Sequence, residues 1–369
     1  SPKWIHLPRG FQSALPGKVC LRLKRSVYGG RNCPRLFYEL IMKALKEFGF
    51  TESKMDPCFL FKKEMMAALF VDDVLLSVAD DKDIDRFVKF LESKNLQLSV
   101  DMELTKYLGI SVKRDAKSIT LTQSGLINRI LEATSMTDCR PNSVPAALKP
   151  LGSDPEGEPM DETWNYCSVV GMLLYLSTNS RPDIALAVSQ VARFSSNPKQ
   201  SHATAIKTII RYLAGTKHIG ITFAPTDMLN IDVFVDAEFA GLWNVEPLHD
   251  PASSKSRFGY IIKLAGCPTV WKSKHMTQTA TSTMHAEYIA LSNALREVIP
   301  LRRLLTEMLP VTNPQYSART PVMRCTVFED NNACLTLAHT RRLTNLTCWL
   351  CTSLHHFWEA VENGEVLID

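Results

Sequence analysis

Two adjacent aspartates, Asp72 and Asp73, are the sharpest chemical signal in the sequence. They interrupt apolar residues that are otherwise suited to burial, with Met65–Val71 on one side and Val74–Val78 on the other. Two carboxylates about 4 Å apart repel each other by roughly 1–4 kcal/mol, depending on the local dielectric. A divalent cation removes this repulsion, and Mg²⁺ prefers one or two carboxylates together with substrate phosphates. The pair therefore indicates either a Mg²⁺ site or a solvent-exposed hairpin turn, where aspartate is common.

A second group of acids lies in the last third of the chain. Asp236 and Asp330 each stand at the end of an expected strand, and Glu287 lies in the first turns of an expected helix. Three carboxylates from separate elements can converge on two metal ions, which activate a water and stabilise the leaving oxygen in phosphodiester hydrolysis. Each acid alone could equally be a cap or a surface charge, and Glu287 could simply favour its helix N-terminus.

A basic window near the start of the chain has no acidic residue before Glu39. Its cations and aromatic residues are Lys18, Arg22, Lys24, Arg25, Tyr28, Arg31, Arg35, Phe37 and Tyr38. Phosphate-seeking cations beside stacking aromatic rings suit nucleic acid. A solvated basic face is the other interpretation of this window.

The hydrophobic pattern predicts the elements that position these residues. The apolar runs around Asp72 and Asp73 predict a tight hairpin. Helices are expected over 37–48, from Asp83 onward, over 124–133, 164–178, 182–194 and 202–214, and after Ser282. Strands are expected over 107–112, 118–122, 231–236, 257–263, 268–272 and 322–328. Residues 139–163 are rich in proline and acids and predict a linker.

The composition is that of a globular protein with two or three domains. Of 369 residues, 45% are hydrophobic and 22% charged, which argues against a disordered chain. The formal net charge is only +4, so nucleic-acid binding must come from local patches. Ten cysteines without framework spacing, and no signal peptide, favour a reducing compartment. The first residue is Ser1, which predicts a processed product or a fragment.

Several blocks resemble a known family. Phe70-Val71-Asp72-Asp73, between apolar strands, resembles the metal-binding hairpin of reverse transcriptases, and the chain as a whole resembles the Pol polyproteins of copia-type long-terminal-repeat retrotransposons. The other blocks, in the family's order, are 24–29, 34–38, 55–58, 107–110, 138–141, 175–176, 181–185 and 211–216. In the last third, residues 236–241, 286–291 and 329–333 resemble the ribonuclease H domain of the same polyprotein.

This resemblance implies a multidomain α/β and α+β fold, in which a truncated reverse-transcriptase palm and thumb precede a ribonuclease H-like domain. The implied ranges are 1–137 for the partial reverse transcriptase, 138–228 for a linker and helical connection region, and 229–369 for the ribonuclease H-like domain.

The resemblance also implies the roles of individual residues. Each acidic group would hold two Mg²⁺ ions, with Mn²⁺ as an alternative. Asp72 and Asp73 would serve primer extension, whereas Asp236, Glu287 and Asp330 would serve hydrolysis of the RNA strand in an RNA–DNA hybrid. The residues expected to contact nucleic acid are Lys24, Arg25, Arg31, Asn32 and Arg35.

The implied partners are an RNA template, a DNA primer, an RNA–DNA hybrid, deoxynucleoside triphosphates and the rest of the Pol polyprotein, with no membrane. The implied location is the cytoplasm, in a virus-like particle, or the nucleus.

Three departures from the family pattern bear on activity. The position of a third palm aspartate would precede Ser1. Asn32 stands where the family has glutamine, and its side chain is one methylene shorter. Thr352 stands where the family has a fourth ribonuclease H carboxylate, so cleavage should be impaired. The alternative hypothesis is therefore a decayed or domesticated relic that binds nucleic acid without catalysis.

A third and weaker hypothesis is a zinc module at the C-terminal end. Cys348, Cys351, His355 and His356 are zinc-ligand types at short spacing. A structural site would need all four ligands crowded into a very short stretch, and adjacent histidines point apart in a helix or strand. A zinc site formed by these four residues is therefore the weakest of the three hypotheses.

Overall fold

The computed structural model of the chain contains helices and sheets in two compact units. It describes residues 4–6, 20–24, 30–96, 98–161, 163–226, 228–313, 323–340 and 355–369. The first unit comprises residues 1–100 and 304–320, and the second comprises residues 101–303 and 321–369. The expected mixture of helices and sheets is confirmed.

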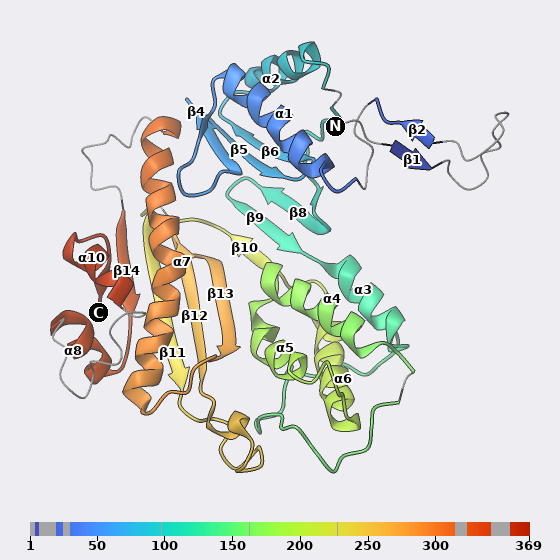
Figure 1. Ribbon diagram of the computed structural model, residues 1–369, viewed down its shortest axis with the longest axis vertical. Helices are drawn as coiled ribbons and strands as arrows, with labels where there is room; N and C mark the ends of the chain where they lie inside the picture. Colours follow the sequence, from blue (N-terminus) through green and yellow to red (C-terminus); the bar gives the residue numbers. More distant parts are fainter. Residues whose placement is uncertain are drawn as a thin grey trace. The chain divides into compact units, whose positions relative to one another are not determined.

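The first unit is built around one antiparallel sheet and two helices (Figure 1). The sheet has the order β3-β4-β5-β6, with β3 Thr51–Glu52, β4 Phe59–Lys62, β5 Met65–Phe70 and β6 Asp73–Val78. The helices are α1 (Cys33–Phe48) and α2 (Lys82–Ser93). Their apolar residues join those of the sheet in a core that includes Ile41, Leu45, Leu60, Ala67 and Leu91. Two further short strands, β1 (Trp4–His6) and β2 (Cys20–Arg22), pair with each other.

Helix α1 shows how local chemistry sets the ends of an element. It ends before Gly49, whose φ of 102° is a left-handed conformation that residues with a side chain rarely adopt, so the expected stop is confirmed. It begins at Cys33, four residues before the expected start, because Pro34 is tolerated in the first turn of a helix, where backbone N–H groups have no partner within the helix.

The second unit begins with a small sheet in the order β10-β9-β8-β7. Its strands are β7 (Lys106–Tyr107), β8 (Ile110–Asp115), β9 (Ser118–Thr122) and β10 (Ile221–Phe223). The single strand expected over 107–112 is wrong. Leu108 and Gly109 have φ of 48° and 77°, which reverses the chain and makes a hairpin of β7 and β8. The hydroxyl of Tyr175 donates to the carbonyl of Leu108 at 2.6 Å and ties this turn to a helix.

Four helices follow and share one apolar core. They are α3 (Ser124–Ala133), α4 (Tyr166–Asn179), α5 (Ala185–Ala192), which continues the short 3₁₀ turn η1 (Pro182–Ile184), and α6 (Gln200–Gly215). Their buried residues include Ile130, Leu173, Leu176, Val188 and Ile206. Each of these helices begins and ends within two residues of its expected position, because its apolar residues recur at helical spacing.

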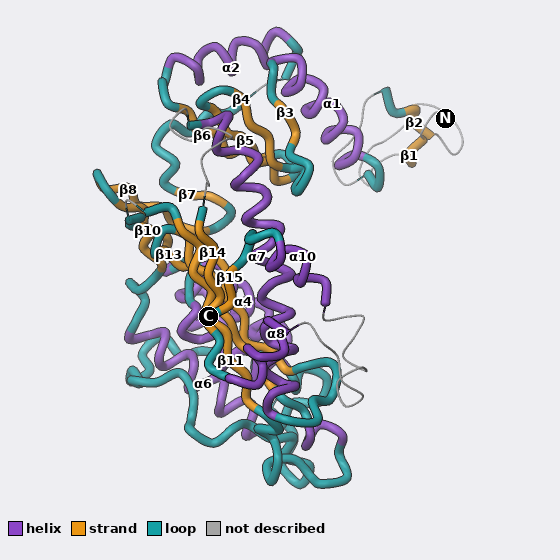
Figure 2. Tube along the Cα trace, turned by 90° about the vertical axis from the view of Figure 1, so that its left-hand side faces the viewer, coloured by secondary structure: helices purple, strands orange, loops and turns teal. Residues whose placement is uncertain are grey.

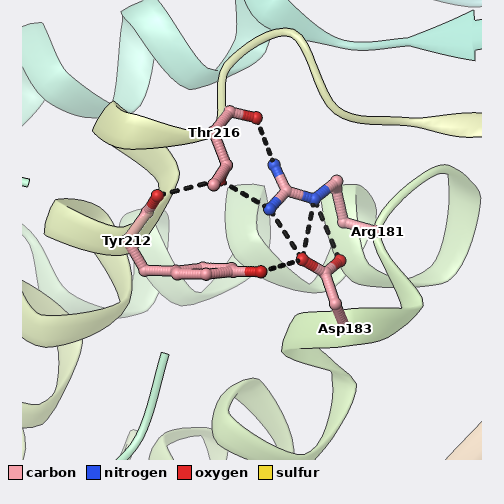
Figure 3. Close-up of polar contacts among 4 residues, drawn as sticks. All are labelled: Arg181, Asp183, Tyr212 and Thr216. Atoms are coloured by element: carbon pink, nitrogen blue, oxygen red, sulfur yellow. Dashed lines mark hydrogen bonds and ion pairs between the residues drawn. The ribbon is translucent and has the colours of Figure 1, made fainter. Parts of the chain in front are cut away.

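An ionic network around the buried Arg181 fixes these helices to one another (Figure 3). Arg181 is fully buried and donates to both carboxylate oxygens of Asp183, with the shortest contact at 2.7 Å. It also donates to the carbonyl and hydroxyl oxygens of Thr216, and the hydroxyl of Tyr212 donates to Asp183 at 2.8 Å. Removing Asp183 would leave the charge of the fully buried Arg181 without its carboxylate partner, which is costly. The network therefore locks the start of η1 to the end of α6.

The described residues of segment 139–163 form no named helix or strand, as the composition predicts. It nevertheless packs against the helices, since Cys139, Leu151 and Met160 contact their core. A ring nitrogen of the buried His202 lies 2.9 Å from the carbonyl oxygen of Gly152. The segment is thus part of the second unit rather than a free spacer.

A five-stranded sheet forms the rest of the second unit, in the order β13-β12-β11-β14-β15. Its strands are β11 (Asn230–Glu238), β12 (Arg257–Leu264), β13 (Cys267–His275), β14 (Arg324–Phe328) and β15 (Leu367–Ile368). Strand β12 is antiparallel to β11 and β13, whereas β14 runs parallel to β11 and β15. Helices α8 (Asn332–Thr340) and α10 (Trp358–Glu362) and residues 283–303 of α7 (Thr283–Thr312) lie on one face of this sheet (Figures 1 and 2). The last residues of α7, 304–312, belong to the first unit. Ile231, Val233 and Leu295 are fully buried in its core.

The compact units divide the chain at a different place from the expected domains. Residues 101–137, expected with the partial reverse transcriptase, cluster with the helices and the five-stranded sheet. The ranges 1–137, 138–228 and 229–369 stay a prediction about function. Of the helices that the structure describes, none combines the length and the apolarity that crossing a bilayer requires.

Candidate metal centre

The three acids of the last third of the chain meet at one end of the five-stranded sheet. Asp236 lies near the end of the central strand β11, and Asp330 lies two residues beyond the end of β14. These strands are parallel and Phe234 pairs with Phe328, so both carboxylates leave the sheet at the same end. Glu287 is the fifth residue of α7. One oxygen of each acid lies within 4.8 Å of the others, so the structure brings the three predicted residues together.

Hydrogen bonds at the starts of α7 and α8 hold the backbone near Glu287 and Asp330 in place. The hydroxyl of Ser282 accepts the backbone N–H of His285 at 3.1 Å, which fixes the first turn of α7 as the sequence predicts. The side-chain oxygen of Asn331 accepts the N–H groups of Ala333 and Cys334, each at 3.0 Å, and caps α8 directly after Asp330. Both acids therefore lie on backbone that is fixed by hydrogen bonds.

Glu287 is the buried member of the group, with 4% of its surface exposed. Burial, together with the nearby carboxylates of Glu329, Asp236 and Asp330, raises the pKa of its carboxyl from 4.5 to about 8. The backbone N–H of Ala237 donates to this carboxyl. Its Oε2 is buried and has no hydrogen-bond partner among the described residues.

Glu329 is a fourth acid that the sequence did not single out as a site residue. It is 5% exposed, and burial raises the pKa of its carboxyl from 4.5 to about 7. Its Oε1 accepts the backbone N–H of Asn331 at 3.1 Å, while its Oε2 is buried without a partner in the described part of the chain. The available signal was its position directly before Asp330, but burial could not be inferred from that position alone.

The donor set of this centre fits a hard divalent cation. Carboxylate oxygens are the ligands that Mg²⁺ and Mn²⁺ prefer. No lysine or arginine forms an ion pair with Asp236, Glu287 or Asp330 within the described ranges. A cation at this position would supply the missing positive charge and a partner for the buried Oε2 of Glu287.

Asp72 and Asp73 lie in the other unit, at the predicted hairpin. Phe70 pairs with Asp73, so Val71 and Asp72 form a two-residue loop, and both aspartates are exposed. Val71 has φ of 56°, a strained conformation for a β-branched residue, and such strain concentrates at functional sites. Among the residues that the structure describes, no third potential ligand joins this pair, since the one such group found is Asp236, Glu287 and Asp330.

The residues expected to contact nucleic acid are exposed where they are described. Lys24, Arg31 and Asn32 are exposed, and Arg35 is exposed but forms an ion pair with Glu39 at 2.8 Å. Arg25 lies outside the described residues, as do Cys348, Cys351 and Thr352. The backbone of His355 and His356 lies in the short 3₁₀ turn η4 (His355–Phe357).

Comparison with known proteins places these features in a family context. Residues 3–148 match the family described as reverse transcriptase (RNA-dependent DNA polymerase). The chain is 32% identical over 319 residues to the retrovirus-related Pol polyprotein from transposon TNT 1-94 of Nicotiana tabacum, covering 83% of this chain and 23% of that protein. It is 31% identical over 328 residues to the corresponding polyprotein from transposon RE1 of Arabidopsis thaliana, covering 87% and 21%.

A shorter relative matches along nearly its whole length. The chain is 27% identical over 304 residues to a transposon Ty5-1 protein of Saccharomyces cerevisiae, covering 80% of this chain and 96% of that protein. By contrast, the chain spans less than a quarter of the length of the two plant Pol polyproteins.

Proposed function

The chain belongs to the family of copia-type retrotransposon Pol polyproteins, and from this membership we propose that it is part of an RNA-directed DNA polymerase that also carries a ribonuclease H-like domain. In this proposal residues 229–369 form the ribonuclease H-like domain. Asp236, Glu287 and Asp330 hold its divalent cations, and the substrate is the RNA strand of an RNA–DNA hybrid.

One observation carries the proposal for this domain. Three acids from two parallel strands and a helix place ligand oxygens within 4.8 Å of one another, and a buried oxygen of Glu287 has no partner in the described part of the protein. Acids that serve only as caps or surface charges do not need to converge, because convergence raises their mutual repulsion.

The chemistry follows from the charges and exposure of these residues. When two Mg²⁺ ions are bound at such a site, they activate a water and stabilise the leaving oxygen of the phosphodiester. Asp236 and Asp330 are exposed, so their oxygens are accessible to a nucleic-acid backbone. Glu287 is buried, and the N–H of Ala237 restrains its carboxyl. The acids alone would repel a phosphate, so the substrate can approach only a centre that holds cations.

For the polymerase part, we take Asp72 and Asp73 as the ligands of Mg²⁺ at the primer end. The RNA template, the DNA primer and the deoxynucleoside triphosphates would contact the exposed residues Lys24, Arg31 and Asn32. Because no third carboxylate joins the pair within the described residues, we expect primer extension to require a further acid from elsewhere in the Pol polyprotein.

Cleavage of an RNA–DNA hybrid tests the proposal. The full chain is incubated with Mg²⁺ and a hybrid whose RNA strand is labelled, and we expect RNA fragments. Asp236→Asn should lower the rate by at least about 100-fold, since changes to outer partners of metal ligands already cost 10–100-fold. Asp232→Asn is the matched control, because Asp232 lies on β11 but outside the ligand group.

Equal residual cleavage by wild type and Asp236→Asn would remove the enzymatic claim for this domain. Hybrid binding without cleavage would then favour the alternative, a relic that binds nucleic acid without catalysis.

A further inference from the structure

Glu329 lies directly beside the acidic centre, on the covered side of the sheet. Val327 and Glu329 are buried, whereas Phe328 and Asp330 are exposed, so the alternation of an extended strand continues past the end of β14. The N–H of Glu329 donates to the carbonyl of Asp369 at 2.9 Å, which holds this extended backbone in place. Its side chain therefore lies on the same face of the sheet as the buried side chain of Val327.

Among the residues that the structure describes, no cation is found that compensates the charge of Glu329. Its charged neighbours are Asp330 and Asp236, and among the acids it has the strongest electrostatic effect on Glu287. The described residues include no ion pair with either glutamate. Each glutamate has one buried oxygen without a partner in that part of the chain. Two adjacent buried carboxyls without a cation are costly, and a bound metal would remove that cost.

We infer that Glu329 is a fourth acid of the metal centre, a positioning residue that acts through Glu287 and supplies the charge needed to hold a second divalent ion. Three carboxylates balance three of the four positive charges of two such ions, and Glu329 balances the fourth. The oxygens of Glu329 are not part of the group within 4.8 Å, so it acts at the edge of the centre rather than within it. This inference rests on the proposed metal centre described above.

The competing explanation is that Glu329 is a neutral buried acid whose role is to bond the N–H of Asn331. The two explanations differ in the effect of Glu329→Gln. Glutamine keeps the size of the side chain and the oxygen that accepts this N–H, and it removes only the charge. A structural role would therefore survive the substitution, whereas a charge-balancing role would not.

Calorimetric titration of the full chain with Mn²⁺, without nucleic acid, separates these explanations. Wild type should bind two ions. Glu329→Gln should weaken the binding of at least one ion by about 10–100-fold, while the melting temperature without metal stays equal or rises. Glu238→Gln is the matched control, since it removes an exposed charge on β11 outside the buried pair, and its affinity should stay within about twofold of wild type.

Glu329→Asp keeps the charge and should bind Mn²⁺ within about threefold of wild type. A loss as large as that of Glu329→Gln would overturn the charge-balancing role, and so would wild-type affinity and stoichiometry in Glu329→Gln.

Asp236→Asn separates a failure of the inference about Glu329 from a failure of the proposed function. If it loses Mn²⁺ while Glu329→Gln does not, only the inference about Glu329 falls. If wild type itself binds no Mn²⁺, the proposed function falls with it.

Discussion

Glu287 and Glu329 are acids whose surroundings oppose ionisation. Burial is the largest cause of the raised pKa for both, and neighbouring acids add to it for both. Each group therefore binds its proton more tightly in the folded chain than in the unfolded chain. Between the ordinary pKa of 4.5 and the raised values of about 7 and about 8, the folded state holds protons that the unfolded state has released.

Without metal, the stability of the folded chain should depend on pH through Glu287 and Glu329. The stabilisation from these two groups is complete below about pH 4.5 and is lost as pH rises through about 7 and about 8. With a chelator present, the free energy of unfolding should fall between pH 6.5 and pH 8.5, a window above the ordinary pKa of histidine, about 6.5. Urea unfolding at several pH values measures this slope.

Glu287→Gln should flatten the same slope, because glutamine does not titrate. A free energy of unfolding that stays constant over this window in wild type would contradict the raised pKa values.

At the scale of elements, the pairing of β10 with β9 depends on a residue without a side chain. Ile221 pairs with Leu121, so the backbone at Gly220 passes very close to β9. A Cβ at Gly220 would lie only 1.9 Å from the carbonyl oxygen of Leu121. One of the two strands would have to move, and overpacking of this kind typically costs about 1–3 kcal/mol.

Gly220→Ala should therefore lower the free energy of unfolding by about 1–3 kcal/mol. Gly125→Ala is the matched control, because Gly125 lies in α3 and a Cβ there would meet nothing within 4 Å. The control should be neutral or stabilising by up to about 1 kcal/mol, since alanine favours helix. Chemical denaturation of both variants compares them, and equal stabilities would show that β9 and β10 do not pair this closely.

At the scale of the whole molecule, charge is distributed unevenly although the net charge is only +4. The candidate metal centre is acidic, whereas the exposed residues Lys24 and Arg31 belong to a basic window. Contacts between cations and phosphates release counterions, so their number sets the salt dependence of binding. The local distribution, and not the net charge, should therefore control the binding of nucleic acid.

Arg31→Ala should weaken binding of an RNA–DNA hybrid to a similar extent for different sequences. The slope of log K against log salt should fall by about one, as expected for the loss of one phosphate contact. Arg86→Ala is the control, since Arg86 is an exposed arginine of α2 that pairs with Asp83 at 3.0 Å. Fluorescence anisotropy at several salt concentrations measures both slopes, and an unchanged slope in Arg31→Ala would exclude a contact from this residue.

Elements with a strong local signal could be predicted from the sequence alone. Helix α3 spans 124–133 as expected, α1 ends at Gly49, and the turn between β12 and β13 contains Ala265-Gly266. Apolar periodicity and the conformational freedom of glycine are properties of a short stretch of chain, so they can be read without knowledge of the fold. The resemblance to ribonuclease H identified Asp236, Glu287 and Asp330 as candidates, and the expected strand ends and helix start agreed with it.

Tertiary structure alone decided how these residues meet and which others join them. The approach of three acids to within 4.8 Å depends on the parallel pairing of β11 with β14 and on the packing of α7, all contacts between distant segments. The burial of Glu329 and the packed state of segment 139–163 depend on the same kind of contact. The turn at Leu108 was missed because leucine rarely adopts positive φ, and here Tyr175, 67 residues away, bonds its carbonyl. A sequence pattern records local preference, whereas burial and convergence arise only when distant segments pack together.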